Sequence, residues 1–203
     1  MSITLVHPDS GTDGAVNFAR DCALDIIAEL VSASIGHTVV TGSMAVRGQV
    51  NAILEASIGK DGAFLGFGHG LPGQLMGFNG ECAFHADDAR LLNNKVCYVL
   101  ACYSFDGLSK AAIQAGAISY VGFEDEFWVP YFFTEELKRC CTKGIKEYLK
   151  GNCKIDEVKL LTENEFTTTI EELDNRDMSD LPPIAPLCVS HFTLDMDRLR
   201  FYP

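Results

Sequence analysis

The stretch AFLGFGHGLPG occupies residues 63–73, and CYVLACYSFDG occupies residues 97–107. Each begins as an apolar run, which predicts a buried strand, and each run stops at small residues and one reactive side chain. These side chains are His69 and Cys102. Strands that are apolar throughout are typical of a parallel sheet covered on both faces. The two stretches therefore decide the fold class, and they place an imidazole and a thiol at two strand ends.

The rest of the first 150 residues alternates between strand and helix patterns. We predict strands over 3–7, 37–42, 62–69, 96–102 and 119–124. We predict helices over 14–30, 44–57, 108–116 and 131–150. Thr12 or Asp13 would cap the first helix and Ser43 the second. This alternation predicts one domain over residues 1–203, with a three-layer α/β fold in which helices cover both faces of a mostly parallel central sheet.

Two segments depart from the alternation. Turn glycines in 71–92 predict a hairpin followed by a short helix from His85 or Ala86. Residues 151–180 hold nine acidic and three basic side chains, which indicates a solvated helix or loop. A Pro-rich turn follows, and LCVSHFTLD (187–195) is predicted to be a final strand at the sheet edge.

Composition narrows the class of protein. The chain has 203 residues, 47% of them hydrophobic, and a formal net charge of −12. That charge argues against nucleic-acid binding, which takes clustered Lys and Arg. No apolar run is long enough to cross a membrane, and the first residues lack the pattern of a signal peptide. The eight cysteines show no disulfide-scaffold spacing, so we expect reduced thiols in a cytoplasmic protein.

The two strand ends suggest a catalytic pair. Parallel sheets place ligands at the carboxyl ends of their strands, and His69 and Cys102 both lie there. If the strands are neighbours, Cys102 would be a nucleophile and His69 its general acid and base. The backbone N–H groups of Gly70 and Cys102 would form an oxyanion hole. The alternative is that each residue is structural, because cysteine is among the most buried residue types.

These motifs resemble the caspase-like cysteine peptidases of clan CD, and most of all the CHAT domains. That family carries His-Gly after one hydrophobic strand and Ala-Cys or a similar pair after the next. Here these are His69–Gly70 and Ala101–Cys102. The segment GQLMGFNGECAFHADDARLL and the strand in GAISYVGFED also resemble CHAT domains, and CVSHFTLDMDRLRFYP loosely resembles their closing strand. No tetratricopeptide array is visible, and the acidic segment 151–180 matches nothing in the family.

The resemblance implies a cysteine endopeptidase that hydrolyses peptide bonds of a protein or peptide substrate through a thioester. It implies no metal and no organic cofactor, and no third acid beside the histidine. It also implies regulated proteolysis, including roles in microbial defence, and a possible regulatory protein partner. The family builds its pocket for the residue before the scissile bond partly from loops that follow the strands.

The loop after the fifth predicted strand reads Glu124-Asp125-Glu126-Phe127-Trp128. Its three carboxylates beside an aromatic ring could select a basic side chain of the substrate. Asp106, four residues after Cys102, is a second acidic candidate. The alternative is a solvated acidic turn, because runs of charge usually lie on the surface.

Other candidate sites have weaker support. Cys82, His85, Cys97 and Cys102 could be drawn as a zinc set, but Cys97 and Cys102 would point to opposite faces of the sheet. His191 falls in the predicted final strand and is expected to be packed. PDSGTDG (8–14) could bind phosphate at a helix N-terminus but lacks the P-loop lysine, and it is better explained as a strand–helix connection.

Two other functions stay open. The chain could be a caspase-like binding or regulatory module with a latent dyad, in which its acidic surface docks a partner. It could also be another doubly wound hydrolase or transferase that uses Cys102 for acyl transfer to or from small molecules. Selective labelling of Cys102 by a thiol probe, suppressed in His69→Ala, would favour the enzyme over the module.

Overall fold

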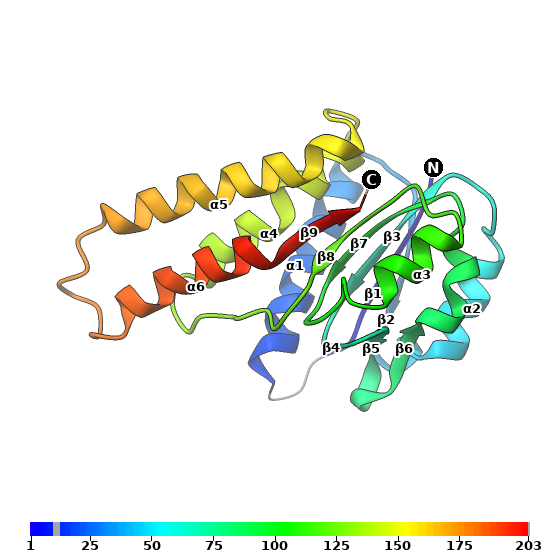
Figure 1. The fold of residues 1–203 in the computed structure, drawn as a ribbon, viewed down its shortest axis with the longest axis horizontal. Coiled ribbons are helices and arrows are strands. Elements are labelled where there is room, and N and C mark those ends of the chain that lie inside the picture. Colours follow the sequence, from blue (N-terminus) through cyan, green and yellow to red (C-terminus); the bar gives the residue numbers. More distant parts are fainter. Residues whose placement is uncertain (10–12, 203) are drawn as a thin grey trace.

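A six-stranded sheet forms the centre of the computed structural model, which describes residues 1–9 and 13–202. The strand order is β2-β1-β3-β7-β8-β9 (Figure 1). The strands are β1 (Ser2–His7), β2 (His37–Thr41), β3 (Gly62–Phe67), β7 (Lys95–Leu100), β8 (Ser119–Phe123) and β9 (Leu199–Tyr202). The first five are parallel, and β9 runs antiparallel to β8. The predicted α/β class with a mostly parallel sheet is confirmed.

Helices cover both faces of this sheet, as predicted. Helices α1 and α4 pack on one face, and α2 and α3 pack on the other. Helix α5 packs against α4, and α6 packs against α5, and both extend to one side of the sheet (Figure 1). The bounds are α1 (Gly14–Ser32), α2 (Arg47–Glu55), α3 (Leu108–Gln114), α4 (Thr134–Leu149), α5 (Val158–Asp174) and α6 (Ala185–Arg198).

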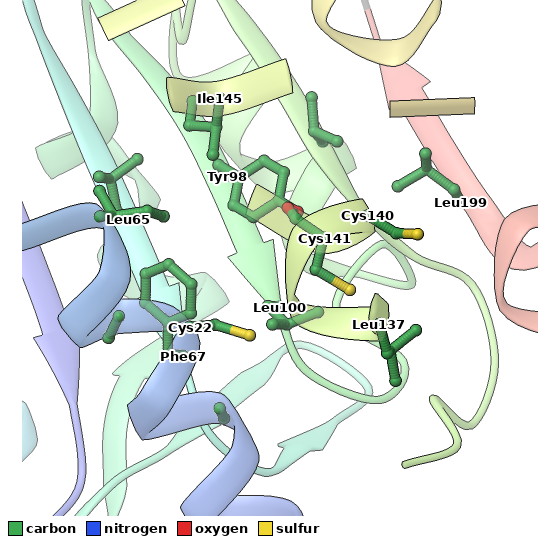
Figure 2. Packing of buried hydrophobic residues seen from close by; sticks show 14 of the residues in the cluster. Cys22, Leu65, Phe67, Tyr98, Leu100, Leu137, Cys140, Cys141, Ile145 and Leu199 are labelled. Carbon is green, nitrogen blue, oxygen red and sulfur yellow. The ribbon is translucent and has the colours of Figure 1, made fainter. Parts of the chain in front are cut away.

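The alternation of side chains along the strands divides the core into two clusters. Leu65, Phe67, Tyr98 and Leu100 face α1 and α4, where they meet buried cysteines of both helices (Figure 2). The Tyr98 hydroxyl donates a hydrogen bond to the Cys141 carbonyl, which satisfies a polar group inside this apolar layer. The alternate positions of the same strands face α2 and α3. Both faces of the sheet are therefore covered by helices and buried, as expected for strands that are apolar throughout.

The segment between β3 and β7 is a small antiparallel sheet. It consists of β4 (Gly70–Leu71), β5 (Gln74–Met76) and β6 (Cys82–His85), followed by a 3₁₀ helix over Ala86–Leu92. This agrees with the predicted hairpin and short helix. The sheet begins directly after His69, so it fixes the direction in which the chain leaves β3.

The predicted helix caps have different outcomes. Asp13 caps α1, because its side chain accepts hydrogen bonds from the N–H groups of Ala15 and Val16. The alternative cap, Thr12, lies outside the described residues. The prediction of Ser43 as the second cap is wrong: Gly42–Met44 is a 3₁₀ turn, and α2 begins only at Arg47. The Ala45 carbonyl accepts a hydrogen bond from the Phe78 N–H of the hairpin segment. This contact holds residue 45 outside the helix, which begins two residues later.

The predicted final strand over 187–195 is wrong. These residues lie in α6, and their buried positions Cys188, Phe192 and Asp195 have helical spacing. The edge strand is formed instead by the next residues, 199–202. The acidic segment 151–180 contains the helix α5, one of the two predicted forms. It buries a face against α4 and α6 rather than standing free in solvent.

Candidate active site

His69 and Cys102 lie at the ends of two neighbouring strands. Strand β3 pairs with β7, with Phe67 opposite Leu100, and the Gly68 N–H donates to the Leu100 carbonyl at 3.2 Å. Both reactive residues line one enclosed notch of about 20 Å³. Its other lining residues come from α1, from the ends of β3 and β7, and from the segment after β8: Ala15, Phe18, Ala19, Gly68, Leu100, Ala101, Phe127 and Val129. The two strand ends therefore open into the same small space.

Asp13 holds the imidazole of His69. The Nε2 atom of His69 lies 2.7 Å from Oδ2 of Asp13. This hydrogen bond, followed by those from the α1 backbone, lowers the pKa of the Asp13 carboxyl. If Nε2 carries the proton that is donated to Asp13, then Nδ1 is left as the basic nitrogen. A carboxylate in this position can fix the tautomer and the orientation of the imidazole, as the third member of a catalytic triad does.

Sequence reasoning recognised Asp13 as a helix cap and missed this second contact. The pair is 56 residues apart in the chain, and it forms because β1 and β3 are adjacent. After β1 the chain enters α1 on one face, and after β3 it enters the hairpin on the other. Ligand sites of α/β sheets form at such a switch point. A signal was therefore present: a carboxylate at the first turn after β1.

The Cys102 thiol is half-buried beneath the segment that follows β8. The Phe127 N–H donates to Sγ with an N···S distance of 3.3 Å. Burial raises the pKa of the Cys102 thiol, and the Phe127 N–H opposes this only in part. Among the described residues, no hydrogen bond joins Sγ to His69. The sulfur is thus protonated and covered in this conformation.

The backbone turns sharply directly after Cys102. Tyr103 adopts φ = 50°, a left-handed conformation that side-chain-bearing residues rarely take. Its N–H donates to the Asp125 carbonyl at 3.0 Å, and the Phe105 N–H donates to the Phe123 carbonyl at 2.9 Å. These two bonds hold the turn against the end of β8. The turn leaves the thiol at the tip of β7.

Gly70 lies directly against the backbone of Cys102. A Cβ atom at residue 70 would stand 1.9 Å from the Cys102 carbonyl oxygen, so only glycine fits without movement. The two residues predicted to supply oxyanion donors are therefore neighbours in space. Their role as donors stays a prediction.

The residues predicted to bind substrate are only partly brought together. Asp106, Glu124 and Asp125 line a cavity of about 730 Å³ beside α3, whereas Glu126 and Trp128 are not in its lining. Neither His69 nor Cys102 borders this cavity. Two of its carboxylates have partners within the chain: Glu124 pairs with an arginine of β9, and Asp125 with one at the end of α6. Their selectivity for a basic side chain stays a prediction.

A smaller cavity adjoins the notch itself. It measures about 170 Å³ and shares Phe18 and Val129 with the lining of the notch. Asp21 of α1 and Glu135 of α4 supply carboxylates to it, and Lys138 supplies a cation. Both carboxylates have cationic partners within the chain: Asp21 pairs with Arg20, and Glu135 with Lys138.

The residues of the weaker candidate sites do not come together in the structure. Cys97 is buried on the α2 and α3 face, whereas Cys102 opens toward α1. No group of three or more potential metal ligands occurs in the part of the chain that the structure describes. His191 lies on α6 with its ring 5.5 Å from the Trp128 ring. No helix within residues 1–9 and 13–202 has the length and apolarity to cross a membrane.

Comparison with known proteins gives the fold its context. Neither protein-family profiles nor curated protein sequences match this chain. Among solved structures, it resembles the Arg-specific cysteine proteinase gingipain R, with a TM-score of 0.62 and 13% identity over 98% of this chain. It also resembles the complex of the pro- and mature domains of RgpB from Porphyromonas gingivalis, with a TM-score of 0.61 and 13% identity over 98% of this chain.

The chain spans 45% and 46% of the length of those two chains, so it is similar to about half of each. At this identity the likeness shows the fold, which is the caspase-like α/β fold of a group of cysteine peptidases. The CHAT family within that fold stays a resemblance of short motifs.

Proposed function

We propose that this chain is a cysteine endopeptidase in which Cys102 is the nucleophile and His69 the general acid and base. The observation that carries the proposal is their shared notch, with Asp13 hydrogen-bonded to Nε2 of the imidazole. A thiol and an oriented imidazole at adjacent strand ends are what nucleophilic acyl transfer needs. The cysteine peptidase fold of the solved neighbours agrees with this chemistry.

The reaction follows from these groups. The Cys102 sulfur gives its proton to His69 and attacks the peptide carbonyl carbon, which forms a tetrahedral oxyanion. The N–H groups of Gly70 and Cys102 would stabilise that oxyanion. His69 then donates the proton to the leaving amine, and a thioester remains on Cys102. Water, deprotonated by His69, attacks the thioester and releases the acid and the free thiol.

The test is peptide cleavage together with labelling by a peptide electrophile. Cys102→Ala and His69→Ala should each abolish cleavage, and Cys102→Ala should also abolish labelling. Cys153→Ala is the matched control, because Cys153 is another half-buried thiol that lies outside the notch. Cleavage by either dyad variant at the wild-type rate would reject the assignment.

A latent binding or regulatory module is the second candidate, and one observation favours it. The thiol pKa is raised and the notch holds only about 20 Å³, so the conformation described here is not poised to attack a peptide. Such a module would label slowly and evenly across its accessible thiols. Labelling that is selective for Cys102 and suppressed in His69→Ala would favour the enzyme.

The proposed substrate preference is a basic side chain before the scissile bond. The neighbouring gingipain R is described as Arg-specific. Carboxylates are offered by both acid-lined cavities, but only the 170 Å³ cavity adjoins the notch. Asp106→Asn and Glu124→Gln would test the larger cavity, and Asp21→Asn the smaller one. Peptide-library cleavage without Arg or Lys at that position would remove the preference altogether.

We also propose a protein partner for this site. One solved neighbour is a complex of pro- and mature domains. The notch of this chain would have to widen before a substrate binds, and the binding of a partner protein could widen it. Cleavage activity that rises when a cell extract is added, and that is lost in Cys102→Ala, would support regulation by a partner.

A further inference from the structure

Residues 124–128, here named the covering segment, lie over the proposed nucleophile. Phe127 of this segment and the neighbouring Val129 line the notch, and the Phe127 N–H contacts the Cys102 sulfur. A space of about 20 Å³ accommodates roughly one water molecule. A peptide carbonyl flanked by two side chains does not fit there. Movement of the covering segment, whose Phe127 contacts the sulfur, would enlarge this space.

The end of α6 and the start of β9 hold this segment residue by residue. Arg200 pairs with the Glu124 carboxylate. Arg198 donates to the Glu126 carbonyl and lies 3.5 Å from the Asp125 carboxylate. At the far end, the Trp128 N–H donates to Oδ1 of Asp195 at 2.9 Å. These contacts arise from six consecutive residues, 195–200, so they form one continuous clamp.

Asp195 is the unusual member of the clamp. Its side chain is 0% exposed, and its second carboxyl oxygen has no hydrogen-bond partner. Burial raises the pKa of this carboxyl to about 8. The charged and titratable groups that face it are Arg198 of α6, the Cys102 thiol at the end of β7, and the Cys141 thiol of α4. His191, one helical turn earlier, lies with its ring tilted by 33° against the Trp128 ring.

We propose that Asp195 is the positioning residue of a proton-controlled latch, which keeps the covering segment closed over Cys102 while Asp195 is neutral and buried. When the segment lifts, Asp195 becomes hydrated and ionises, and the thiol becomes accessible. The latch would regulate the proposed peptidase site, so its biological meaning rests on the proposed function. The latch itself is a property of the fold and can be tested without any cleavage assay.

The sign of the pH effect follows from linkage. A carboxyl that is neutral when buried and ionised when exposed loses one proton on opening, at any pH between its usual value near 4 and about 8. Opening therefore becomes about tenfold more favourable for each unit of pH in that range. The thiolate fraction of the exposed Cys102 also rises about tenfold per unit below its own pKa. The two effects multiply.

The experiment is alkylation of the folded chain by iodoacetamide between pH 5.5 and 7.5, with modification of Cys102 followed by peptide mass spectrometry. Wild type should show a rate that rises about a hundredfold per pH unit. Asp195→Asn keeps an oxygen acceptor for the Trp128 N–H but cannot ionise, so its rate should rise only about tenfold per unit. Asp197→Asn, on the exposed side of α6, is the matched control and should behave as wild type.

A second variant keeps the test independent of how well Asp195→Asn folds. Arg198→Ala removes the bond to the Glu126 carbonyl and should accelerate labelling several-fold at every pH, with the steep wild-type slope retained. An Asp195→Asn protein with the wild-type slope, or an Arg198→Ala protein with the wild-type rate, would overturn the latch. A chain that shows both effects but cleaves no peptide would retain the latch and lose the proposed peptidase.

Discussion

Replacement of Gly70 by alanine should disturb the fold and the thiol together. The added Cβ would stand 1.9 Å from the Cys102 carbonyl oxygen, whereas ordinary contacts begin at 3.4 Å, so one backbone must retreat by about 1.5 Å. Overpacking of this kind costs about 1 to 3 kcal/mol, and the entropy gained by removing a glycine returns less than about 1 kcal/mol. We expect a net loss of about 1 to 2 kcal/mol in the free energy of unfolding.

Two other glycines provide control variants for this prediction. At Gly77, a Cβ would also stand 1.9 Å from a carbonyl oxygen, that of Ala45, but away from the notch. At Gly48, within α2, a Cβ would meet nothing within 4 Å, so alanine there should stabilise the chain by about 0.5 to 1 kcal/mol. Urea unfolding measures all three variants, and iodoacetamide labelling reports on Cys102. Only Gly70→Ala should change both. A Gly70→Ala protein with wild-type stability and labelling would refute the close approach of the two backbones.

Three further predictions concern other parts of the chain. Lys95 is buried and its Nζ donates to the Ser57 and Lys60 carbonyls at 2.8 and 2.7 Å, so Lys95→Met should cost about 2 to 4 kcal/mol in urea unfolding. Asp13→Ala should cost about 1 kcal/mol through the lost cap, and Asp13→Asn should keep the cap. The pKa of Asp13 is lowered in the folded chain, so its charge stabilises the fold above about pH 4. This stabilisation is lost as pH falls through the lowered pKa of the folded chain. The acid unfolding of Asp13→Asn should therefore lack this loss of stability. In the native chain, the half-buried thiols outside the notch, Cys82 and Cys153, should react with a maleimide within minutes, and the fully buried thiols should react only after unfolding.

The strands of the sheet could be predicted because their signal is local. A run such as 96–100 is apolar at every position, and only a strand buried on both faces accommodates that pattern at this length. The proximity of His69 and Cys102 then followed from one assumption, that their strands are neighbours. The assumption is correct because β3 pairs directly with β7.

The parts that sequence reasoning got wrong or missed depend on contacts between distant segments. Residues 187–195 contain apolar, aromatic and β-branched side chains, so they resemble a strand, but in α6 they bury one side against α5. The edge strand over 199–202 has only four residues, so its sequence pattern is weaker than that of residues 187–195. The bond between Asp13 and His69 was invisible for the same reason, because it needs the order of β1 and β3 in the sheet.

Because residues 187–202 form α6 and β9 rather than a strand over 187–195, the acidic residues of the covering segment have a different role from the predicted one. With a strand over 187–195, the loop after β8 would face solvent, and its carboxylates would be free to select a basic side chain. With α6 leading into β9, Arg198 and Arg200 lie against that loop and pair with Asp125 and Glu124. A basic substrate side chain would then have to displace an arginine of the chain itself. The loop carboxylates therefore serve first to hold the covering segment over Cys102.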